Sequence, residues 1–261
     1  MPAVPDGLRV EREGAVSILT VARPETRNAL SFAVMGALTA ALHEATRDRR
    51  LRALVITGEG KAFVSGGDLR ELRVAGTSAD AERLCAAGRG VCEAIERLDV
   101  PVIAAINGAA IGGGVELAVA CDLRIADERA KLCFKHVRMG LVTSWGTFPR
   151  LLQLVGASTA ARLLFTAHDV RATEARSLGL VDQVTESGAS VATALAWAED
   201  IAQGSPSAVA NMKGLFRDSR AANVELAARE QARFVASWTS DDHRDAVEAF
   251  FESRAPKWRE R

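Results

Sequence analysis

The chain contains the stretch Val102-Ile103-Ala104-Ala105-Ile106-Asn107-Gly108-Ala109-Ala110-Ile111-Gly112-Gly113-Gly114-Val115-Glu116-Leu117. Its first five residues form a short apolar run, which is typical of a buried strand. The glycines that follow permit a tight connection, and a helix is expected to begin at Gly113 or Gly114. Residues 102–121 are apolar enough to raise the question of a membrane span. Asn107, Glu116 and the glycines favour a strand, a turn and a helix start instead.

Strands and helices alternate on the N-terminal side of this stretch. Residues 16–21 and 52–57 are apolar, β-branched runs that predict two further strands. Ser31 is a suitable N-cap for a helix that runs to about residue 47, and residues 79–98 predict another helix. Strands that are apolar on both faces and alternate with helices indicate an α/β fold with a parallel sheet and helical crossovers.

The C-terminal part of the chain is predicted to be mostly helical. Only residues 181–184 read as a clear extended interruption after residue 145. The expected helices are 156–165, 173–178, 189–202, 206–217, 224–238 and 241–253. The chain is therefore expected to have a core rich in strands and helices at residues 1–200, followed by a helical region at residues 201–261.

Composition narrows the class of protein. The 261 residues contain 33 basic and 33 acidic side chains, so the sequence has no electrostatic footprint for nucleic acid. The cysteines Cys85, Cys92, Cys121 and Cys133 lack metal-site spacing and read as reduced, mostly buried thiols. The N-terminus does not resemble a signal peptide. We expect a soluble, cytoplasmic protein that binds neither nucleic acid nor membrane.

Two glycine clusters, at residues 62–69 and 107–117, follow two apolar strands. Neither matches a phosphate-binding P-loop or a dinucleotide fingerprint. One interpretation is that the glycines only let a helix pack closely on a strand. The other is that the two loops face each other and aim two backbone N–H groups at one oxygen, as in an oxyanion hole. Losing one such donor costs roughly 3–4 kcal/mol of transition-state stabilisation.

Several motifs in a fixed order carry a resemblance to a known family. They are Arg23-Pro24 with Asn28-Ala29-Leu30, the two glycine clusters, Pro101 to Gly108, Cys121 to Ala126, Ala172 to Ala175, Gly179 to Asp182 and Phe250 to Arg254. Together they resemble the enoyl-CoA hydratase/isomerase, or crotonase, superfamily over nearly the whole chain. The resemblance implies an α/β spiral of ββα units with a helical C-terminal region used for assembly into a homotrimer or a dimer of trimers.

The resemblance also implies site residues. The N–H groups of Gly67 and Gly113 would form the oxyanion hole and polarise an acyl-CoA carbonyl. Coenzyme A would enter as part of the substrate, with no permanently bound cofactor and no metal. The substrate-binding residues implied are Arg23, Arg27, Asn28, Ala29, Ser65, Asp68, Leu69, Arg70, Gly112, Ser144 and Trp145. Asp68 is also expected to accept hydrogen bonds from the turn that follows it. Lys257 and Arg259 are candidates for contact with the nucleotide of a neighbouring subunit.

One position departs from the family pattern. Hydratases of this family hold a water between two glutamates; Glu116 stands where the first is expected, and His136 stands where the second would be. His136 can supply a proton because an imidazole titrates near ~6.5. The alternative is a polar residue beside the pocket with no catalytic part. A tyrosine acid is excluded, because the chain has no tyrosine. His43, His168 and His243 are expected to be solvated.

The leading hypothesis for function is hydration of a 2-enoyl-CoA, or the reverse dehydration, with Glu116 and His136 managing water and proton. Three alternatives stay open. The enzyme could instead isomerise a double bond in a CoA ester, or hydrolyse a carbon–carbon bond in a β-diketone. The last alternative is a non-catalytic oligomer that binds acyl-CoA.

Overall fold

A six-stranded sheet forms the centre of the molecule. The computed structural model describes residues 7–72, 76–221 and 224–258. The strand order is β1 (Leu8–Glu13), β2 (Val16–Val21), β3 (Ala53–Gly58), β5 (Val102–Ile106), β7 (Leu123–Asp127) and β10 (Gln183–Thr185). β1 and β2 pair antiparallel, and every later pairing is parallel. The predicted parallel sheet is confirmed, with one added hairpin at its edge.

A second sheet lies beside the first and contains β4 (Ala62–Val64), β6 (Ala109–Ile111), β8 (Lys131–Cys133) and β9 (Val170–Arg171). β4, β6 and β8 run parallel to one another, and each follows the long strand β3, β5 or β7 after a short turn. The chain thus passes from one sheet to the other and then into helix, three times over. This is the expected spiral of ββα units.

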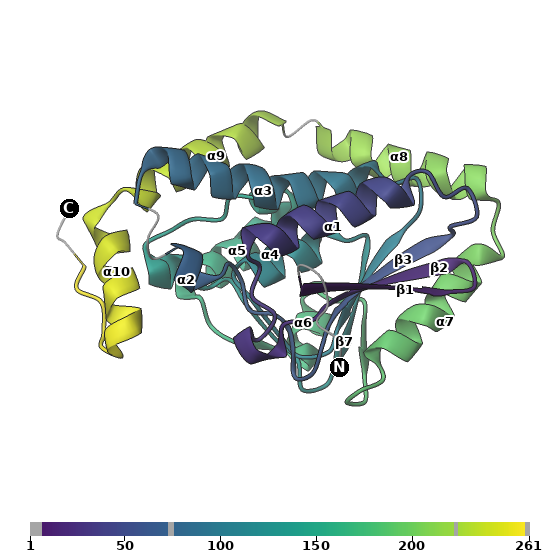
Figure 1. Ribbon diagram of the computed structural model, residues 1–261, viewed down its shortest axis with the longest axis horizontal. Coiled ribbons are helices and arrows are strands. Elements are labelled where there is room, and N and C mark those ends of the chain that lie inside the picture. The colour runs from purple at the N-terminus through teal and green to yellow at the C-terminus, as the bar shows by residue number, and fades with distance from the viewer. Residues whose placement is uncertain (1–6, 73–75, 222–223, 259–261) are drawn as a thin grey trace.

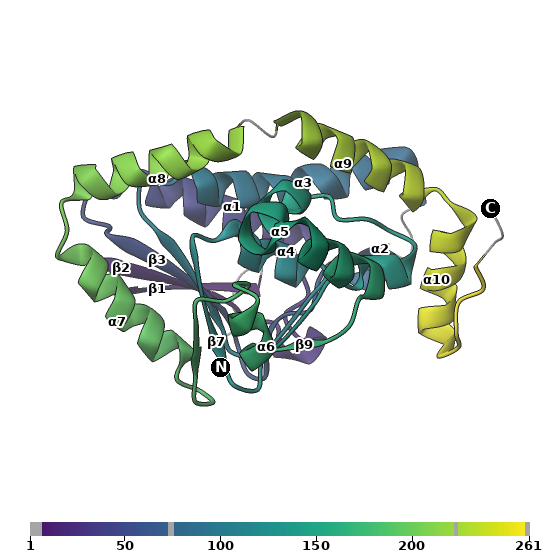
Figure 2. The same ribbon diagram turned by 180° about the vertical axis from the view of Figure 1, so that it is seen from behind.

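Helices cover both faces of the central sheet. α1 (Phe32–Ala45) and α3 (Ser78–Arg97) lie side by side on one face (Figure 1). α7 (Ser190–Ala202) covers the opposite face, where its Ala194 and Ala198 pack on Val55 and Ile103 (Figure 2). Ser31 caps α1 as predicted, since its side chain accepts a hydrogen bond from the N–H of Val34.

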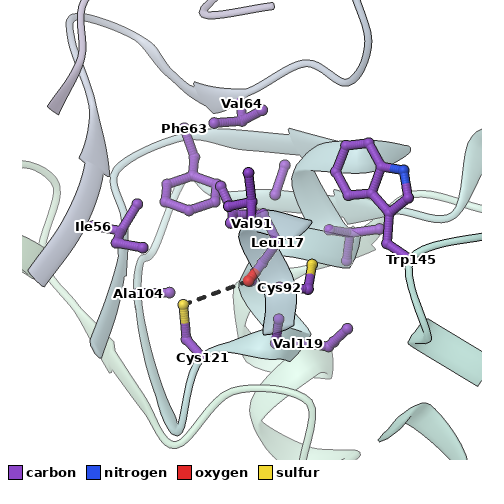
Figure 3. Close-up of a cluster of buried hydrophobic side chains, with 14 of the residues drawn as sticks. Ile56, Phe63, Val64, Val91, Cys92, Ala104, Leu117, Val119, Cys121 and Trp145 are labelled. Carbon is purple, nitrogen blue, oxygen red and sulfur yellow. Dashed lines mark hydrogen bonds between the residues drawn. The ribbon is translucent and has the colours of Figure 1, made fainter. Parts of the chain in front are cut away.

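The short helix α4 (Gly113–Ala120) lies in the middle of the core, and every one of its residues is buried. Figure 3 shows Leu117 and Val119 of this helix among Ile56, Phe63, Val91 and Trp145, which come from four other segments. An eight-residue helix with no exposed face is held entirely by its neighbours. Its first turn is therefore a rigid place for functional groups.

The remaining elements lie in the connections within and after the ββα units. η2 (Pro24–Thr26), α2 (Leu69–Leu72) and η3 (Lys135–Met139) are single turns in the loops, and α5 (Thr147–Thr166) and α6 (Ala172–Ser177) precede β10. The helix predicted at 156–165 is the second part of α5, because Gly156 interrupts the helix with a φ of 73°. The first part, from Thr147, was not expected. β1, β4, β6, β7, β8 and β9 were not predicted either.

Three helices end the chain: α8 (Pro206–Ala221), α9 (Val224–Trp238) and α10 (Asp241–Glu252). α9 packs on α3 and α5, and α10 packs against η3. The expectation that His243 is solvated is wrong: its ring is buried, stacks on Trp238 and hydrogen-bonds the carbonyl of Met139. The boundary at residue 200 and the role of this region in assembly stay predictions.

All four cysteines are free and buried, as expected. Within the described ranges, no helix is both long and apolar enough to cross a bilayer.

Candidate active site

The two glycine loops meet at the N-terminus of α4. Gly66 has a φ of 104°, a conformation that favours glycine, and a Cβ added there would lie 3.1 Å from the carbonyl oxygen of Ile111 and 3.5 Å from the nitrogen of Gly113. Gly112 also has a positive φ, of 54°. Gly66 therefore permits a close approach of the two backbones, whereas Gly112 supplies a turn conformation that favours glycine. The expectation that the loops face each other agrees with this packing.

The backbone N–H groups of Gly67 and Gly113 are not used by the secondary structure. Gly67 lies opposite Leu30 in a parallel bridge, where the bonds are made by the carbonyl of Gly66 and the N–H of Asp68. This leaves the N–H of Gly67 directed away from Leu30. Gly113 is the first residue of α4, so its N–H has no acceptor within the helix.

Glu116 lies in the first turn of α4 and is 2% exposed. Its Oε1 accepts hydrogen bonds from the N–H of Ser144 at 2.9 Å, the N–H of Trp145 at 3.2 Å and the hydroxyl of Thr147 at 2.9 Å. Burial by itself raises the pKa of this carboxyl, but the nearby His136 and the N–H donors outweigh burial and lower it. Glu116 is therefore an ionised carboxylate in a buried position.

The other carboxylate oxygen of Glu116 faces His136. Oε2 lies 3.0 Å from Nε2 of the imidazole, whose side chain is 11% exposed. A carboxylate can only accept a hydrogen bond, so this contact favours the tautomer with the proton on Nε2. Nδ1 is buried and has no hydrogen-bond partner among the described residues. The lone pair of Nδ1 is therefore not engaged by a donor from the described part of the chain.

Trp145 forms a wall between α3 and α4. A Cβ at Gly88 would lie 1.9 Å from Cε2 of the indole, and a Cβ at Gly113 would lie 2.5 Å from Cη2. The ring occupies the space that these two glycines leave open, beside the N-terminus of α4 (Figure 3). Ser144 and Trp145, both predicted to bind substrate, are buried, and their N–H groups donate hydrogen bonds to Glu116.

The loop at residues 23–29 is fastened to the first glycine loop by Arg23. Its guanidinium donates to the carbonyl of Ala29 at 2.8 Å and to Oδ2 of Asp68 at 2.9 Å. Asp68 also accepts from the N–H of Arg70, as expected. Arg23 and Asp68 thus neutralise each other, and their charges hold the two loops together.

Asn28 and Ser65 belong to the same framework. Asn28 is fully buried, and its amide nitrogen donates to the carbonyls of Glu59 and Ala62. The Ser65 hydroxyl donates to the carbonyl of Thr26 at 3.1 Å. These side chains shape the loops from within, so any contact of theirs with a substrate would come from backbone atoms.

Two arginines of these loops face solvent. Arg27 and Arg70 are exposed, and neither belongs to an ion pair among the residues that the structure describes. Leu69 lies beside Arg70 in α2 and is partly buried. An exposed guanidinium group is suited to a phosphate-bearing ligand. Lys257 lies at the far C-terminal end, and Arg259 lies outside the described residues.

Glu230 is a charged residue at the site that sequence reasoning missed. Glu230 of α9 is 6% exposed, and its Oε1 accepts hydrogen bonds from Thr143 and from the N–H of Phe148. Glu230 shares one face of α9 with Phe234 and Trp238, four and eight residues later, and both of these are buried. A carboxylate on an otherwise apolar helix face was a signal present in the sequence.

Within the described part of the chain, no cluster of three or more His, Cys, Asp or Glu side chains is arranged to hold a metal ion.

Comparison with known proteins shows similarity over almost the whole chain. The family model described as enoyl-CoA hydratase/isomerase matches residues 11–261. A short-chain-enoyl-CoA hydratase of Clostridium acetobutylicum is 35% identical over 94% of both chains. A 2,3-dehydroadipyl-CoA hydratase of Escherichia coli is 31% identical over 97% of this chain and 99% of that protein. The crystal structure of an enoyl-CoA hydratase/isomerase from Pseudoalteromonas atlantica is 31% identical, with a TM-score of 0.87 over 97% of this chain and all of the other.

Proposed function

Because the chain belongs to the enoyl-CoA hydratase/isomerase family of the crotonase superfamily, we propose that it hydrates a 2-enoyl-CoA, or dehydrates the corresponding 3-hydroxyacyl-CoA. The observation that carries the proposal is the Glu116–His136 pair at the N-terminus of α4, beside two glycine loops. The acyl group stays open. The proposed location is the cytoplasm, with no permanently bound cofactor.

The oxyanion hole is assigned to the N–H groups of Gly67 and Gly113. Neither group is used by the strand ladder or the helix, and both belong to the pair of loops that pack together. The thioester oxygen gains negative charge only as an enolate forms. Donors fixed in the rigid core therefore stabilise the transition state more than the bound substrate.

His136 is the proposed acid and base, and Glu116 is its orienting partner. In hydration, Nδ1 takes a proton from water as the water oxygen bonds to the β-carbon, and the electron pair of the double bond moves toward the carbonyl. The imidazolium then returns that proton to the α-carbon, and the thioester carbonyl re-forms. The ionised Glu116 stabilises the imidazolium during the step and fixes the ring orientation.

The direct contact in this pair also supports a second candidate, double-bond isomerisation. A water that bridges two groups holds them roughly 4.5 Å apart, because two hydrogen bonds of about 2.8 Å meet at an angle at its oxygen. Nε2 and Oε2 are only 3.0 Å apart, so no water fits between them in this arrangement. One proton shuttle is sufficient for isomerisation, because the proton removed from the α-carbon of a 3-enoyl-CoA can be returned to the γ-carbon.

Substrate binding is assigned to the loops on the exposed side of the site. Arg27 and Arg70 are proposed to contact the phosphates of coenzyme A. Trp145 is proposed to form one wall of the acyl pocket, because its ring packs against Gly113. Assembly into a trimer, or a dimer of trimers, is proposed for the C-terminal helices, where Met212, Leu215 and Phe216 of α8 are exposed.

The test uses the purified chain with crotonyl-CoA, a longer 2-enoyl-CoA and a 3-enoyl-CoA. Loss of the conjugated thioester absorbance reports hydration, and its appearance from the 3-enoyl-CoA reports isomerisation. We expect the wild type to catalyse hydration. We expect the rate of hydration to be lower in His136→Ala by about 10²-fold or more, as for loss of a general acid–base. His136→Glu restores the pair of carboxylates used by other hydratases.

Three results would argue against hydration as the natural reaction. Isomerisation without hydration would select the second candidate. Cleavage of a β-diketone panel in the absence of CoA would select carbon–carbon hydrolysis. Binding of acyl-CoA with no turnover of any of these compounds, and none gained in His136→Glu, would select the non-catalytic protein.

A further inference from the structure

The C-terminal helix α9 reaches the active site through Glu230. This residue comes from a region that is expected to serve assembly, yet its carboxylate is buried against the loop at residues 143–148. Oε1 accepts a hydrogen bond from the Thr143 hydroxyl and another, at 2.8 Å, from the N–H of Phe148. One carboxylate oxygen therefore accepts a hydrogen bond from each end of the loop.

The middle of the same loop holds Glu116. Oε1 of Glu116 accepts three hydrogen bonds, from Ser144, Trp145 and Thr147. All three donors lie between the two residues that hydrogen-bond to Glu230. Arg150 also donates to the same loop, at the carbonyl of Trp145, with a distance of 2.6 Å. Glu230 and Arg150 thus both hold the loop, and the loop presents its donors to Glu116.

The chemistry of Glu230 shows that the position is not chosen for core packing alone. Its Oε2 is buried and has no hydrogen-bond partner in the described part of the chain. Burial, followed by the charge of Glu116, raises the pKa of Glu230 to about 6. An apolar side chain would fill this place between Ala227 and Phe234 without the cost of desolvating a carboxylate.

We propose that Glu230 is a positioning residue for the reaction: it fixes the loop whose N–H and hydroxyl groups hold Glu116, and through Glu116 it sets the orientation of His136. This inference rests on the proposed catalytic role of the Glu116–His136 pair. It gives the C-terminal region a part in the chemistry of its own subunit, in addition to any part in assembly.

The kinetic test compares Glu230→Ala with Glu230→Gln. The alanine removes the acceptor, so we expect kcat to fall by about 10²-fold, the scale of a 1 Å misplacement, while KM changes by less than about threefold. The glutamine keeps an oxygen that can accept both hydrogen bonds and should recover most of kcat. Glu225→Ala is the matched control, because Glu225 lies on the same helix but is exposed.

A second readout does not depend on turnover. Nitrogen chemical shifts of the His136 imidazole report which ring nitrogen carries the proton, and the chain has only 4 histidines to assign. We expect the Nε2–H form in the wild type and in Glu230→Gln, and a mixture of tautomers in Glu230→Ala. If Glu230→Ala does not fold, Thr143→Val is measured in the same way, because it removes the hydroxyl that donates a hydrogen bond to Glu230.

The two kinds of failure can be separated. A wild type inert on every substrate, with the tautomer change still present in Glu230→Ala, would contradict the proposed function and support the positioning role. Wild-type kcat and an unchanged His136 spectrum in Glu230→Ala would overturn the positioning role. So would equal loss of kcat in the alanine and glutamine variants with the His136 spectrum unchanged.

Discussion

Oε2 of Glu116 meets Nε2 of His136 at 3.0 Å, while Oε1 of the same carboxylate takes all three hydrogen bonds from the loop at residues 143–148. The two oxygens therefore have separate tasks. One oxygen fixes the carboxylate to the protein, and the other fixes the imidazole. A base oriented by a buried carboxylate is a recurring arrangement in enzymes that move one proton.

Glu116→Gln tests this division of tasks. A glutamine can keep its oxygen toward the loop, but its amide nitrogen would then face Nε2 of His136 as a second donor. The imidazole would have to place its proton on Nδ1, which removes the free lone pair from that nitrogen. We expect kcat to fall by about 10²–10⁴-fold with KM nearly unchanged, measured by steady-state kinetics on the substrate that the wild type turns over best.

The control for this variant is thermal unfolding. Glu116→Gln should unfold at or near the wild-type temperature, since the loop keeps its acceptor. Wild-type kcat in Glu116→Gln would contradict the orienting role of the carboxylate.

Gly88 and Gly90 offer a matched pair for testing how Trp145 is seated. Both lie in α3, but a Cβ at Gly88 would lie only 1.9 Å from the indole of Trp145, whereas a Cβ at Gly90 would meet open space. We expect Gly88→Ala to lower the free energy of unfolding by about 1–3 kcal/mol through overpacking, and Gly90→Ala to raise it by up to about 1 kcal/mol through helix propensity.

Chemical denaturation of the two variants and the wild type measures these differences. Gly88→Ala should also lower kcat, because displacement of Trp145 moves an N–H donor of Glu116. Equal stability of the two variants would mean that the indole does not occupy the space beside Gly88.

The buried Glu230 predicts a pH dependence of stability. Its pKa is raised from 4.5 to about 6, so the folded protein binds more protons than the unfolded chain between these values. The stabilising contribution is complete below pH 4.5 and is lost as the pH rises through 6. The rise in the pKa of Glu230 from 4.5 to about 6 corresponds to about 2 kcal/mol.

Glu230→Gln removes the ionisable group and keeps the shape. We expect it to be more stable than the wild type by about 2 kcal/mol at pH ~8, with the difference vanishing near pH ~4. Urea unfolding at several pH values, with Glu225→Gln as the exposed control on α9, measures the difference. A pH-independent difference between Glu230→Gln and the wild type would contradict the raised pKa.

The parts of the fold that the sequence predicted are those whose apolar residues extend over at least five positions. The strands at 16–21 and 102–106 coincide with β2 and β5, because each is a run of apolar and β-branched residues. The helix at 224–238 coincides with α9, because its apolar residues recur at helical spacing. The short strands β4, β6 and β8 have only three residues each, too few to show a period. They exist because parallel neighbours pair with them in the second sheet.

The site residues also divide into those that a local motif reveals and those that it does not. Glu116 and His136 were found by their places in a motif, and the structure brings their side chains together. Glu230 lies more than 80 residues further along the chain, at separations of 82 and 87 from its two partners, so no local spacing connects them. The burial of His243 escaped prediction for a similar reason, since its partner Met139 is 104 residues away.

The last prediction concerns the two exposed arginines at the edge of the site. If Arg27 and Arg70 contact the phosphates of coenzyme A, neutral glutamines at these positions should weaken binding without touching the groups that move the proton. We expect KM to rise by about tenfold for each variant, because a hydrogen bond to a charged group contributes about 1.5 kcal/mol, and kcat to stay within about twofold.

Salt dependence distinguishes a phosphate contact from a change in loop shape. The wild-type KM should rise with ionic strength, and the rise should be smaller in Arg27→Gln/Arg70→Gln, because fewer charges are then screened. Arg47→Gln, at an exposed arginine beyond the end of α1, is the control and should leave KM unchanged. A KM that is the same in wild type and double variant at low salt would remove these arginines from the binding site, and the phosphates would then have to be held by other groups.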